Sequence, residues 1–335
     1  MTRRERVIAA LRHEDTDIVP YSIDCTMQAM DALVEYTGNP NIEDEMGCHL
    51  HYIQYWNYPT ELEDKPEHFK DGFGVTWNRE GADKDIGVSD IVIDEPEIEL
   101  YPTPELPEAR IRAEIEAHLA VKGDRFTFAG IGFSMFERLW SYCGMENALV
   151  WMLTDEEFVD ELLDKILEHN LKVIDIYNEY DLDGFYFGDD WGQQKGLIMG
   201  PDLWRRFIKP RMAKMYAHAK KGGKFILQHS CGDCSEILPD LVEIGLDCYQ
   251  TFQPEVYDIV KIKEEIGDRL SFWGGISTQQ VLPYVSPEEV KAECIRVKDI
   301  LSKNGGYIWA PTHALAFDVP PANIVAMLEV FKGQK

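Results

Sequence analysis

The sequence predicts an α/β fold, a closed (β/α)8 TIM barrel with an N-terminal insertion or lid. Apolar segments of strand length alternate with helix-like segments through the second half of the chain, at 20–35 residues per unit. Such alternation is typical of βα repeats around a parallel sheet. Two further strand-like segments, near residues 17 and 49, bring the expected strands to eight. A doubly wound sheet is disfavoured because no Gly-x-Gly-x-x-Gly fingerprint follows the first strand.

The first hundred residues are the least regular part of the chain. Residues 4–13 are expected to form an amphipathic helix, and 17–23 a first strand that leads into a loop with Asp24 and Cys25. A short second strand is expected around His49 and His51. We interpret a β insertion within 26–100, acting as a lid over the barrel mouth or as a homodimer surface, with two arms over 72–77 and 90–94.

From residue 102 onward the order becomes regular. Runs rich in β-branched and aromatic residues predict buried parallel strands, and longer periodic stretches predict helices. The expected strands cover 125–132, 183–191, 224–228, 246–252, 270–277 and 307–313, and the expected helices cover 108–122, 144–152, 155–179, 201–220 and 321–332. Because such barrels take about 250 residues and grow by insertion, we expect residues 1–335 to form a single domain.

Composition excludes several classes of partner. The formal net charge of −27 opposes binding to nucleic acid and to anionic membranes, since phosphate contacts need clustered Lys and Arg. No apolar run approaches the roughly 18 residues of a membrane span, and the N-terminus lacks the apolar core of a secretion signal. Seven Cys, an odd number, fit a reducing compartment. The expected location is therefore the cytoplasm.

Chemistry-bearing side chains fall at the ends of the expected strands, and a barrel brings those ends to one face. His229 and Cys231 lie two apart, so both can point the same way from an extended segment. If His313, after the last strand, closes on them, the three form a zinc site with an open fourth position, as catalytic zinc has. The alternatives are a hydrogen-bonded structural His313 and a redox pair of Cys231 with Cys234.

Other strand-end residues are candidates for catalysis and substrate binding. Adjacent carboxylates on a strand point to opposite sides, so at most one of the catalytic candidates Asp189 and Asp190 should enter the site. The aromatic residues near the mouth can belong to the core or form walls for a flat apolar substrate. The candidate substrate-binding residues are Phe133, Trp191, Gln253 and Ser277.

Four segments carry a resemblance to a known family. They are Phe187-Gly-Asp-Asp-Trp-Gly-Gln193, His229-Ser-Cys-Gly-Asp233, Phe272-Trp-Gly-Gly-Ile-Ser-Thr-Gln279 and 310–323, which begins Ala-Pro-Thr-His. With them the chain resembles the uroporphyrinogen decarboxylase superfamily, and within it the zinc-dependent, corrinoid-linked methyltransferases. The zinc motif of that branch is His-x-Cys with a distant Cys. His229 and Cys231 match its first two positions, whereas His313 stands where the branch has its distant Cys.

The resemblance implies methyl transfer, and the departure at His313 suggests its direction. Zinc with one thiolate and two imidazoles keeps a charge of about +1, whereas two thiolates and one imidazole cancel it, so the former is the stronger Lewis acid. The resemblance thus implies an O-demethylase component, in which zinc activates the oxygen of a methoxylated, aromatic compound. The methyl group passes to cob(I)alamin on a separate corrinoid protein, since this chain lacks the Asp-x-His-x-x-Gly pattern of corrinoid domains.

Three alternatives stay open. The family's decarboxylases carry an N-terminal Arg-Gln-Ala-Gly-Arg segment, but the corresponding region here reads Asp24-Cys-Thr-Met-Gln-Ala-Met30, which speaks against a substrate with many carboxylates. A methylcorrinoid:thiol methyltransferase would run the transfer toward a thiol. A non-catalytic protein that binds a corrinoid or tetrapyrrole could use the same scaffold, since fold does not fix function.

Overall fold

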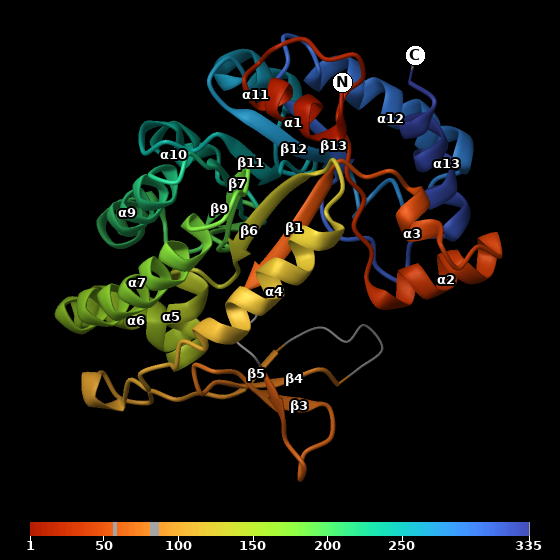
Figure 1. The fold of residues 1–335 in the computed structure, drawn as a ribbon. Coiled ribbons are helices and arrows are strands. Elements are labelled where there is room, and N and C mark those ends of the chain that lie inside the picture. The colour runs from red at the N-terminus through yellow and green to blue at the C-terminus, as the bar shows by residue number, and fades with distance from the viewer. Residues whose placement is uncertain (56–58, 81–86, 335) are drawn as a thin grey trace.

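A computed structural model describes residues 1–55, 59–80 and 87–334. It shows a mixed α/β, TIM-barrel-like fold, in which one curled parallel sheet is surrounded by helices (Figure 1). The strand order in the sheet follows the chain, as βα repeats require. In that order the strands are β1 (Leu50–Tyr55), β6 (Phe126–Ile131), β7 (Gly184–Gly188), β10 (Phe225–His229), β11 (Cys248–Thr251), β12 (Ser271–Ile276) and β13 (Tyr307–Pro311).

The expected first strand over 17–23 is wrong as a regular strand. Instead, residues 20–22 form a single parallel bridge between Tyr21 and Trp309 of β13. The Trp309 N–H donates to the Pro20 carbonyl at 2.8 Å, and the His49 N–H, just before β1, donates to the Tyr21 carbonyl at 2.9 Å. Pro20 has no N–H to extend a ladder. The segment therefore joins β13 to the residues just before β1 through a few backbone hydrogen bonds. A closed barrel would have a complete strand at this position.

Helices cover the outside of the sheet (Figure 1). The helices expected from periodicity are present, although the one over 201–220 is interrupted by a π-helical turn at Trp204–Ile208. They are α1 (Arg3–Leu11), α4 (Glu108–Val121), α6 (Met145–Thr154), α7 (Glu156–Asn178), α8 (Pro201–Leu203), α9 (Lys209–Lys220) and α13 (Pro321–Lys332). The others are α2 (Met27–Thr37), α3 (Ile42–Glu45), α5 (Phe136–Cys143), α10 (Leu238–Glu243), α11 (Ile259–Ile266) and α12 (Pro287–Leu301). Among the described residues, no helix is long and apolar enough to cross a membrane.

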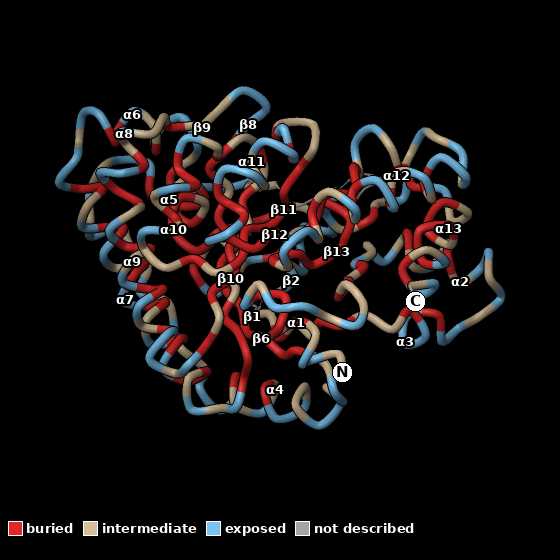
Figure 2. Tube along the Cα trace, turned by 90° about the horizontal axis from the view of Figure 1, so that it is seen from above, coloured by how far each residue is buried: buried red, intermediate tan, exposed pale blue. Residues whose placement is uncertain are grey.

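Aromatic rings fill the barrel interior below its mouth. The Tyr52 and Phe128 rings stack with centroids 4.9 Å apart, and Trp273 meets Phe128 edge-on at 5.9 Å. Gly130 makes room for this packing, because a Cβ there would lie 2.6 Å from the Tyr52 ring. Buried residues concentrate in the strands at the centre of the molecule (Figure 2). The barrel is thus a packed core that supports a site at one end.

A second, antiparallel sheet lies beyond the carboxyl end of β1 (Figure 1). It comprises β2 (Thr60–Glu61), β3 (His68–Lys70), β4 (Thr76–Asn78) and β5 (Gly87–Asp90). The expected arms over 72–77 and 90–94 are displaced from these strands. Most of the first arm is a turn instead, since the Asp71 carboxylate accepts the N–H groups of Phe73 and Val75 at 2.9 and 3.0 Å. This sheet forms a roof over the barrel mouth.

Candidate metal centre and its two cavities

Three side chains that could together hold a metal ion, referred to below as the metal-binding residues, meet at the barrel mouth. His229 ends β10, Cys231 follows two residues later, and His313 follows β13. One ligand atom from each lies within 4.8 Å of the others. The Cys231 Sγ is 3.6 Å from the His229 Nε2, and the two imidazole centroids are 5.6 Å apart. Strands far apart in the sequence thus bring the three residues together.

The donor set fits zinc. Tetrahedral zinc with N and S ligands places its donor atoms about 3.3–3.8 Å apart. The separation of Cys231 Sγ from His229 Nε2 lies in that range. All three ligand atoms lie within 4.8 Å of one another, so small side-chain shifts would bring them to the distances that zinc requires. One thiolate and two imidazoles make three protein ligands, which leaves a fourth position open.

Gln250 sets the tautomer of His229. The His229 Nδ1 is hydrogen-bonded to the Gln250 Oε1. The orientation of this amide is fixed, because its Nε2 donates to the Thr312 carbonyl at 3.3 Å and its Oε1 accepts from the Tyr186 hydroxyl at 3.3 Å. An amide oxygen only accepts, so Nδ1 carries the proton and the Nε2 lone pair is left for a metal.

Asp190 faces the same centre. Its Oδ1 accepts from the Cys231 N–H at 2.7 Å and lies 3.4 Å from the His229 Nε2. Burial would raise the pKa of Asp190, but when the His229 ring is protonated, its hydrogen bond and charge together with the Cys231 N–H outweigh burial and lower that pKa. A metal on Nε2 would take the place of this ring proton. An ionised carboxylate therefore stands beside two of the three metal-binding side chains.

Asp189 points away from the centre, so the geometry does not support the expected catalytic role. Its buried carboxylate accepts the N–H groups of Met135, Phe136 and Glu137 at 3.1, 2.9 and 2.8 Å, which caps α5. It also accepts from the Trp191 Nε1 at 2.5 Å. Burial raises the pKa of Asp189, and these N–H donors oppose the rise. Asp189 is a positioning residue for α5.

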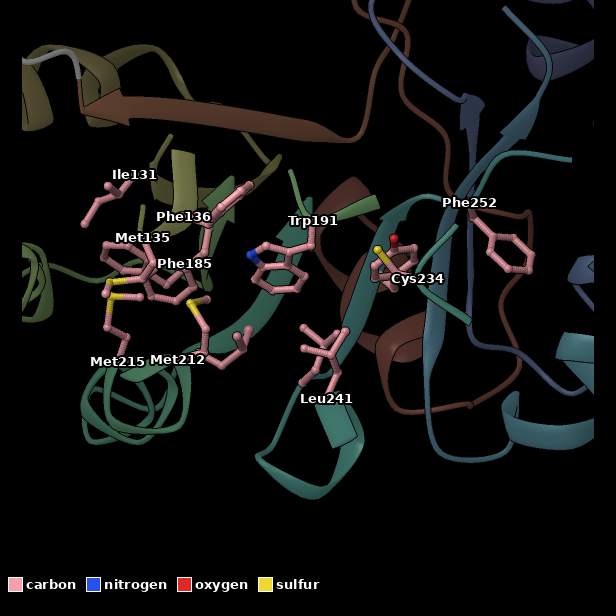
Figure 3. Packing of buried hydrophobic residues seen from close by; sticks show 14 of the residues in the cluster. Ile131, Met135, Phe136, Phe185, Trp191, Met212, Met215, Cys234, Leu241 and Phe252 are labelled. Atoms are coloured by element: carbon pink, nitrogen blue, oxygen red, sulfur yellow. The ribbon is translucent and has the colours of Figure 1, made fainter. Parts of the chain in front are cut away.

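Trp191 belongs to the core, which corrects its assignment to substrate. Its indole is fully buried and packs on Trp204 with centroids 5.3 Å apart. Figure 3 shows it among Phe136, Met212 and Leu241, on the core side of the strands. It lines neither of the cavities described below.

Of the three other expected substrate-binding residues, Gln253 lines a cavity, Ser277 does not, and Phe133 belongs to the aromatic cavity described below. Gln253 lines a polar cavity, and its Oε1 accepts the Gly232 N–H at 2.7 Å, which holds the loop after Cys231. Ser277 is buried, donates to Glu255 and accepts the Gln280 N–H at 2.8 Å. It lines neither cavity, so its contacts stabilise the loop after β12 instead of meeting substrate.

The two cysteines of the Cys-x-x-Cys pattern have different surroundings. Cys234 is fully buried, and burial raises the pKa of its thiol to about 12. Its Sγ meets the Ser230 hydroxyl at 3.4 Å, and both cysteines are free thiols. A thiol that resists ionisation is a poor redox partner, which disfavours the redox reading.

An aromatic cavity of about 430 Å³ opens beside the metal-binding residues, beneath the inserted sheet. Its wall contains the expected substrate-binding residue Phe133, which packs edge-on against Trp77 of the roof with centroids 4.9 Å apart. The cavity is lined by Tyr52, Gln54, Tyr55, Pro59, Phe69, Asp71, Phe73, Trp77, Ile131, Gly132, Phe133, Glu137, Arg138, Tyr186, Gly188, Asp190, His229 and His313.

Two lining residues, Glu137 and Arg138, were missed by the sequence reasoning. Both lie in the first turn of α5, a helix that is not among those expected from the sequence. Burial raises the pKa of Glu137 well above its usual range, and the neighbouring Asp190 and Asp189 carboxylates add to the rise. Glu137 therefore holds a proton at a higher pH than an ordinary carboxyl. No local sequence signal marked this helix start, because its cap comes from Asp189.

A second, polar cavity of about 430 Å³ lies on the other side of the centre. Cys231 lines this cavity, His229 lines the aromatic one, and His313 lines both. The polar cavity is lined by Gly192, Gln193, Gln194, Cys231, Gly232, Gln253, Thr278, Gln279, His313, Ala314, Ala316 and Asp318. The metal-binding residues thus stand between an aromatic cavity and an amide-rich one.

Comparison with known proteins yields one family match and several relatives. The family described as Uroporphyrinogen decarboxylase (URO-D) matches residues 87–334. A methylated-thiol–coenzyme M methyltransferase of Methanosarcina mazei is 28% identical over 162 residues, which is 45% of this chain and 40% of the relative. A uroporphyrinogen decarboxylase of Chlorobium phaeovibrioides is 24% identical over 214 residues, 62% of this chain and 59% of the relative.

One solved structure agrees with the fold along its whole length. A methyltransferase from Methanosarcina mazei superimposes with a TM-score of 0.73, at 19% identity, over 99% of both chains. At this identity the likeness establishes the fold alone. The alignments with the curated relatives span 40% and 59% of their own lengths, so their activities do not transfer directly.

Proposed function

The chain belongs to the uroporphyrinogen decarboxylase family, and from this we propose that it is a zinc-dependent methyltransferase of the O-demethylase kind. It would move a methyl group from a small methoxylated aromatic compound to the cob(I)alamin of a separate corrinoid protein. The observation that carries the proposal is the set His229, Cys231 and His313 between an aromatic and a polar cavity. Donor and acceptor can then approach one centre from different sides.

The identity of the third ligand favours an oxygen donor. Zinc held by His229, Cys231 and His313 would supply a Lewis acid with a charge of about +1, suited to stabilising negative charge that develops on an ether oxygen. A thiolate-rich shell would instead keep a sulfur nucleophilic. His313 in place of a second thiolate therefore supports methyl removal from oxygen over methyl delivery to a thiol.

The chain's own residues would prepare the substrate and handle the proton. The aromatic walls, Phe133 among them, would hold a flat ring, and the inserted sheet would exclude water from it. When the carbon–oxygen bond breaks, the electron pair stays on the oxygen, which then needs a proton. Glu137, whose pKa is raised by burial, lines the same cavity and would give up that proton.

The polar cavity would receive the corrinoid. Corrin rings carry many amide side chains, and Gln193, Gln194 and Gln279 offer matching donors and acceptors. Beside it, Phe317 is 54% exposed between two cavity-lining residues, and Met27 is 78% exposed at the start of the adjoining α2. Exposed apolar side chains at a rim suit contact with a partner protein, here the corrinoid protein.

Two other family activities are weaker candidates. The curated Methanosarcina mazei relative is named a methylated-thiol–coenzyme M methyltransferase, and this name supports a thiol methyltransferase as an alternative function. A decarboxylase of porphyrinogens would need several cations for its carboxylates. Among the described residues that line the aromatic cavity, Arg138 is the one Lys or Arg.

Methyl transfer to free cob(I)alamin, followed by the cobalt spectrum, tests the proposal. Zinc-loaded protein should demethylate a methoxylated arene, and Cys231→Ser and His313→Ala should lose zinc together with the activity. Cys25→Ser is the matched control, since this half-buried thiol lies outside the metal-binding set. Protein that binds corrinoid but never retains zinc would favour a non-catalytic binding protein. A cytoplasmic location and a homodimer stay predictions.

A further inference from the structure

A third cavity, of about 480 Å³, lies at the other end of the barrel from the metal-binding residues. It sits between the carboxyl-terminal ends of α11 and α12, two helices on the side of the molecule away from the inserted sheet (Figure 1). The segments after these helices lead into β12 and β13, so the cavity lies at the amino-terminal ends of the strands. Its lining includes two lysines, two carboxylates and two aliphatic side chains: Lys263, Lys303, Glu264, Asp268, Val260 and Ile300.

The amine of Lys263 contacts the backbone of the turn before β13. Its Nζ donates to the Gly305 carbonyl at 2.7 Å. Asn304, Gly305 and Gly306 have φ angles of 60°, 70° and 68°, a left-handed run that favours glycine. A Cβ on Gly306 would lie 3.4 Å from the Lys263 Nζ and 2.5 Å from the His13 ring. The turn therefore leaves room for the amine.

Lys263 has no carboxylate partner in the part of the chain that the structure describes. Although Glu264 and Asp268 line the same cavity, no Asp or Glu oxygen lies within 4.0 Å of the Nζ. Burial of this half-buried side chain disfavours the ammonium and lowers the pKa of Lys263 to about 8. At the end of α1, burial and the charge of Lys263 lower the pKa of His13, so His13 adds no positive charge near pH 8.

A neutral amine in this position can act as a nucleophile. One N–H donates to the Gly305 carbonyl, and the nitrogen lone pair remains for a ligand in the cavity. Acylation would replace a charge that burial disfavours with a neutral amide. Carbamylation by carbon dioxide would instead add a negative charge beside Glu264 and Asp268. The surroundings therefore favour an acyl group over a carbamate.

The rest of the lining suits an acyl phosphate as the donor. Val260 and Ile300 give a short acyl chain an apolar wall. Lys303 supplies a cation in the same cavity, which attracts the phosphate leaving group. The cavity thus offers a nucleophile, an apolar surface and a counter-charge in one place.

We propose that Lys263 is a site of acylation, at which its amine takes a short acyl group from an acyl phosphate. The amine nitrogen bonds to the acyl carbon, and the carbon–oxygen bond to phosphate breaks with its electron pair on the phosphate. One amine proton passes to the departing phosphate. The new amide keeps an N–H for the Gly305 carbonyl. This site lies apart from the metal-binding residues and does not rest on the proposed function.

Partial acetylation of zinc-loaded wild-type protein with acetyl phosphate at pH 8 tests the proposal. Peptide mass spectrometry at low total modification gives the relative rate at each lysine. An ordinary lysine is about 0.4% neutral at this pH, against about half for Lys263. Because a less basic amine is a weaker nucleophile, we expect a net rate about tenfold above that of the exposed Lys303 in the same cavity. Equal rates at Lys263 and Lys303 overturn the proposal.

Lys224 separates the effect of the cavity from that of burial. Its Nζ also donates to a backbone carbonyl, that of Tyr180 at 2.8 Å, and burial lowers its pKa as well. It lines none of the three cavities, so it should react about tenfold more slowly than Lys263 or slower still. Comparable rates at Lys224 and Lys263 would show that the cavity plays no part and would overturn the assignment.

The pH dependence gives a second readout on the same protein. The rate at Lys263 should level off above about pH 8, where its amine is already neutral, whereas the rate at an ordinary lysine rises to about pH 10. The groups that face this amine are Glu264 and Asp268 after and on α11, Lys303 after α12, and His13 after α1. A Lys263 rate that rises in parallel with that of Lys303 up to pH 10 overturns the proposal.

A variant that fills the cavity completes the test. Val260→Trp places a large side chain at an exposed position of the lining and should lower the acetylation rate at Lys263 by about fivefold or more. Ile295→Trp is the matched control, because Ile295 is equally exposed on α12 but does not line the cavity. An unchanged rate at Lys263 in Val260→Trp overturns the role of the cavity.

Discussion

At the scale of single residues, the bond between His229 and Gln250 decides which ring nitrogen is available to a metal. Because Gln250 fixes the proton on Nδ1, its loss should weaken metal binding without touching a ligand. We expect Gln250→Leu to lower zinc affinity by about 10–100-fold, measured by competition with a chromogenic chelator. Gln228→Leu is the control, since the Gln228 amide contacts the Tyr216 hydroxyl at 2.6 Å and the His229 backbone carbonyl at 2.7 Å but neither ring nitrogen of His229. Equal zinc affinity in both variants would contradict the assignment.

Glu137 should leave a signature in the pH dependence of stability. Its pKa is raised above the ordinary 4.5 in the folded protein, so the folded state keeps a proton that the unfolded chain has lost. The free energy of unfolding should therefore fall as pH rises from about 4.5 toward the raised pKa. Glu137→Gln cannot ionise and should lack this decline, so its stability relative to wild type should grow over that range.

Urea unfolding of zinc-free protein between about pH 4.5 and 7 measures this difference. Glu146→Gln, at an exposed position of α6, controls for the loss of one negative charge from a chain of net −27. A difference between Glu137→Gln and wild type that stays constant with pH would contradict a raised pKa.

At the scale of elements, α5 depends on a cap from another strand. The Asp189 carboxylate receives the first N–H groups of α5, and that helix carries Glu137 and Arg138 into the aromatic cavity. Asp189→Asn should lower the free energy of unfolding by about 1–3 kcal/mol, since an amide cannot accept all these bonds. Asp155→Asn, before α7, makes no side-chain cap and should cost less than about 0.5 kcal/mol. Lost activity at unchanged stability would instead indicate a catalytic Asp189.

The helix α5 shows why part of the site could not be predicted from the sequence. The expectation that residues at strand ends gather on one face placed four residues at the mouth: His229, Cys231, Asp190 and Phe133. It depends on two features that can be predicted from sequence, the alternation of side chains along a strand and the shared direction of the parallel strands in a barrel. The start of α5 could not be predicted from the local sequence, since its capping residue, Asp189, lies more than fifty residues away in the chain. Gln250 escaped for a related reason, because its pairing with His229 is set by the register of β10 and β11.

At the scale of the whole molecule, the sequence predicted the parallel barrel and the order of its repeats, and the structure shows both. It did not predict that residues 20–22 contact β13 through one isolated bridge, at the place where a closed barrel has a complete strand. Nor did it predict that Trp77 and Phe73 line the aromatic cavity, since aromatic residues at these positions fit the core of the expected lid equally well. Long-range packing of this kind has no local pattern.

For the whole molecule, we propose that one metal centre between two cavities removes methyl groups from oxygen. Methyl transfer to cob(I)alamin from matched methoxyarenes, methylamines and methylthiols, with zinc-loaded wild-type protein, measures it most directly. We expect the cobalt spectrum to report methylation from methoxyarenes and little from the nitrogen or sulfur donors. Methylation from thiols alone, or from no oxygen donor at all, would contradict the claim.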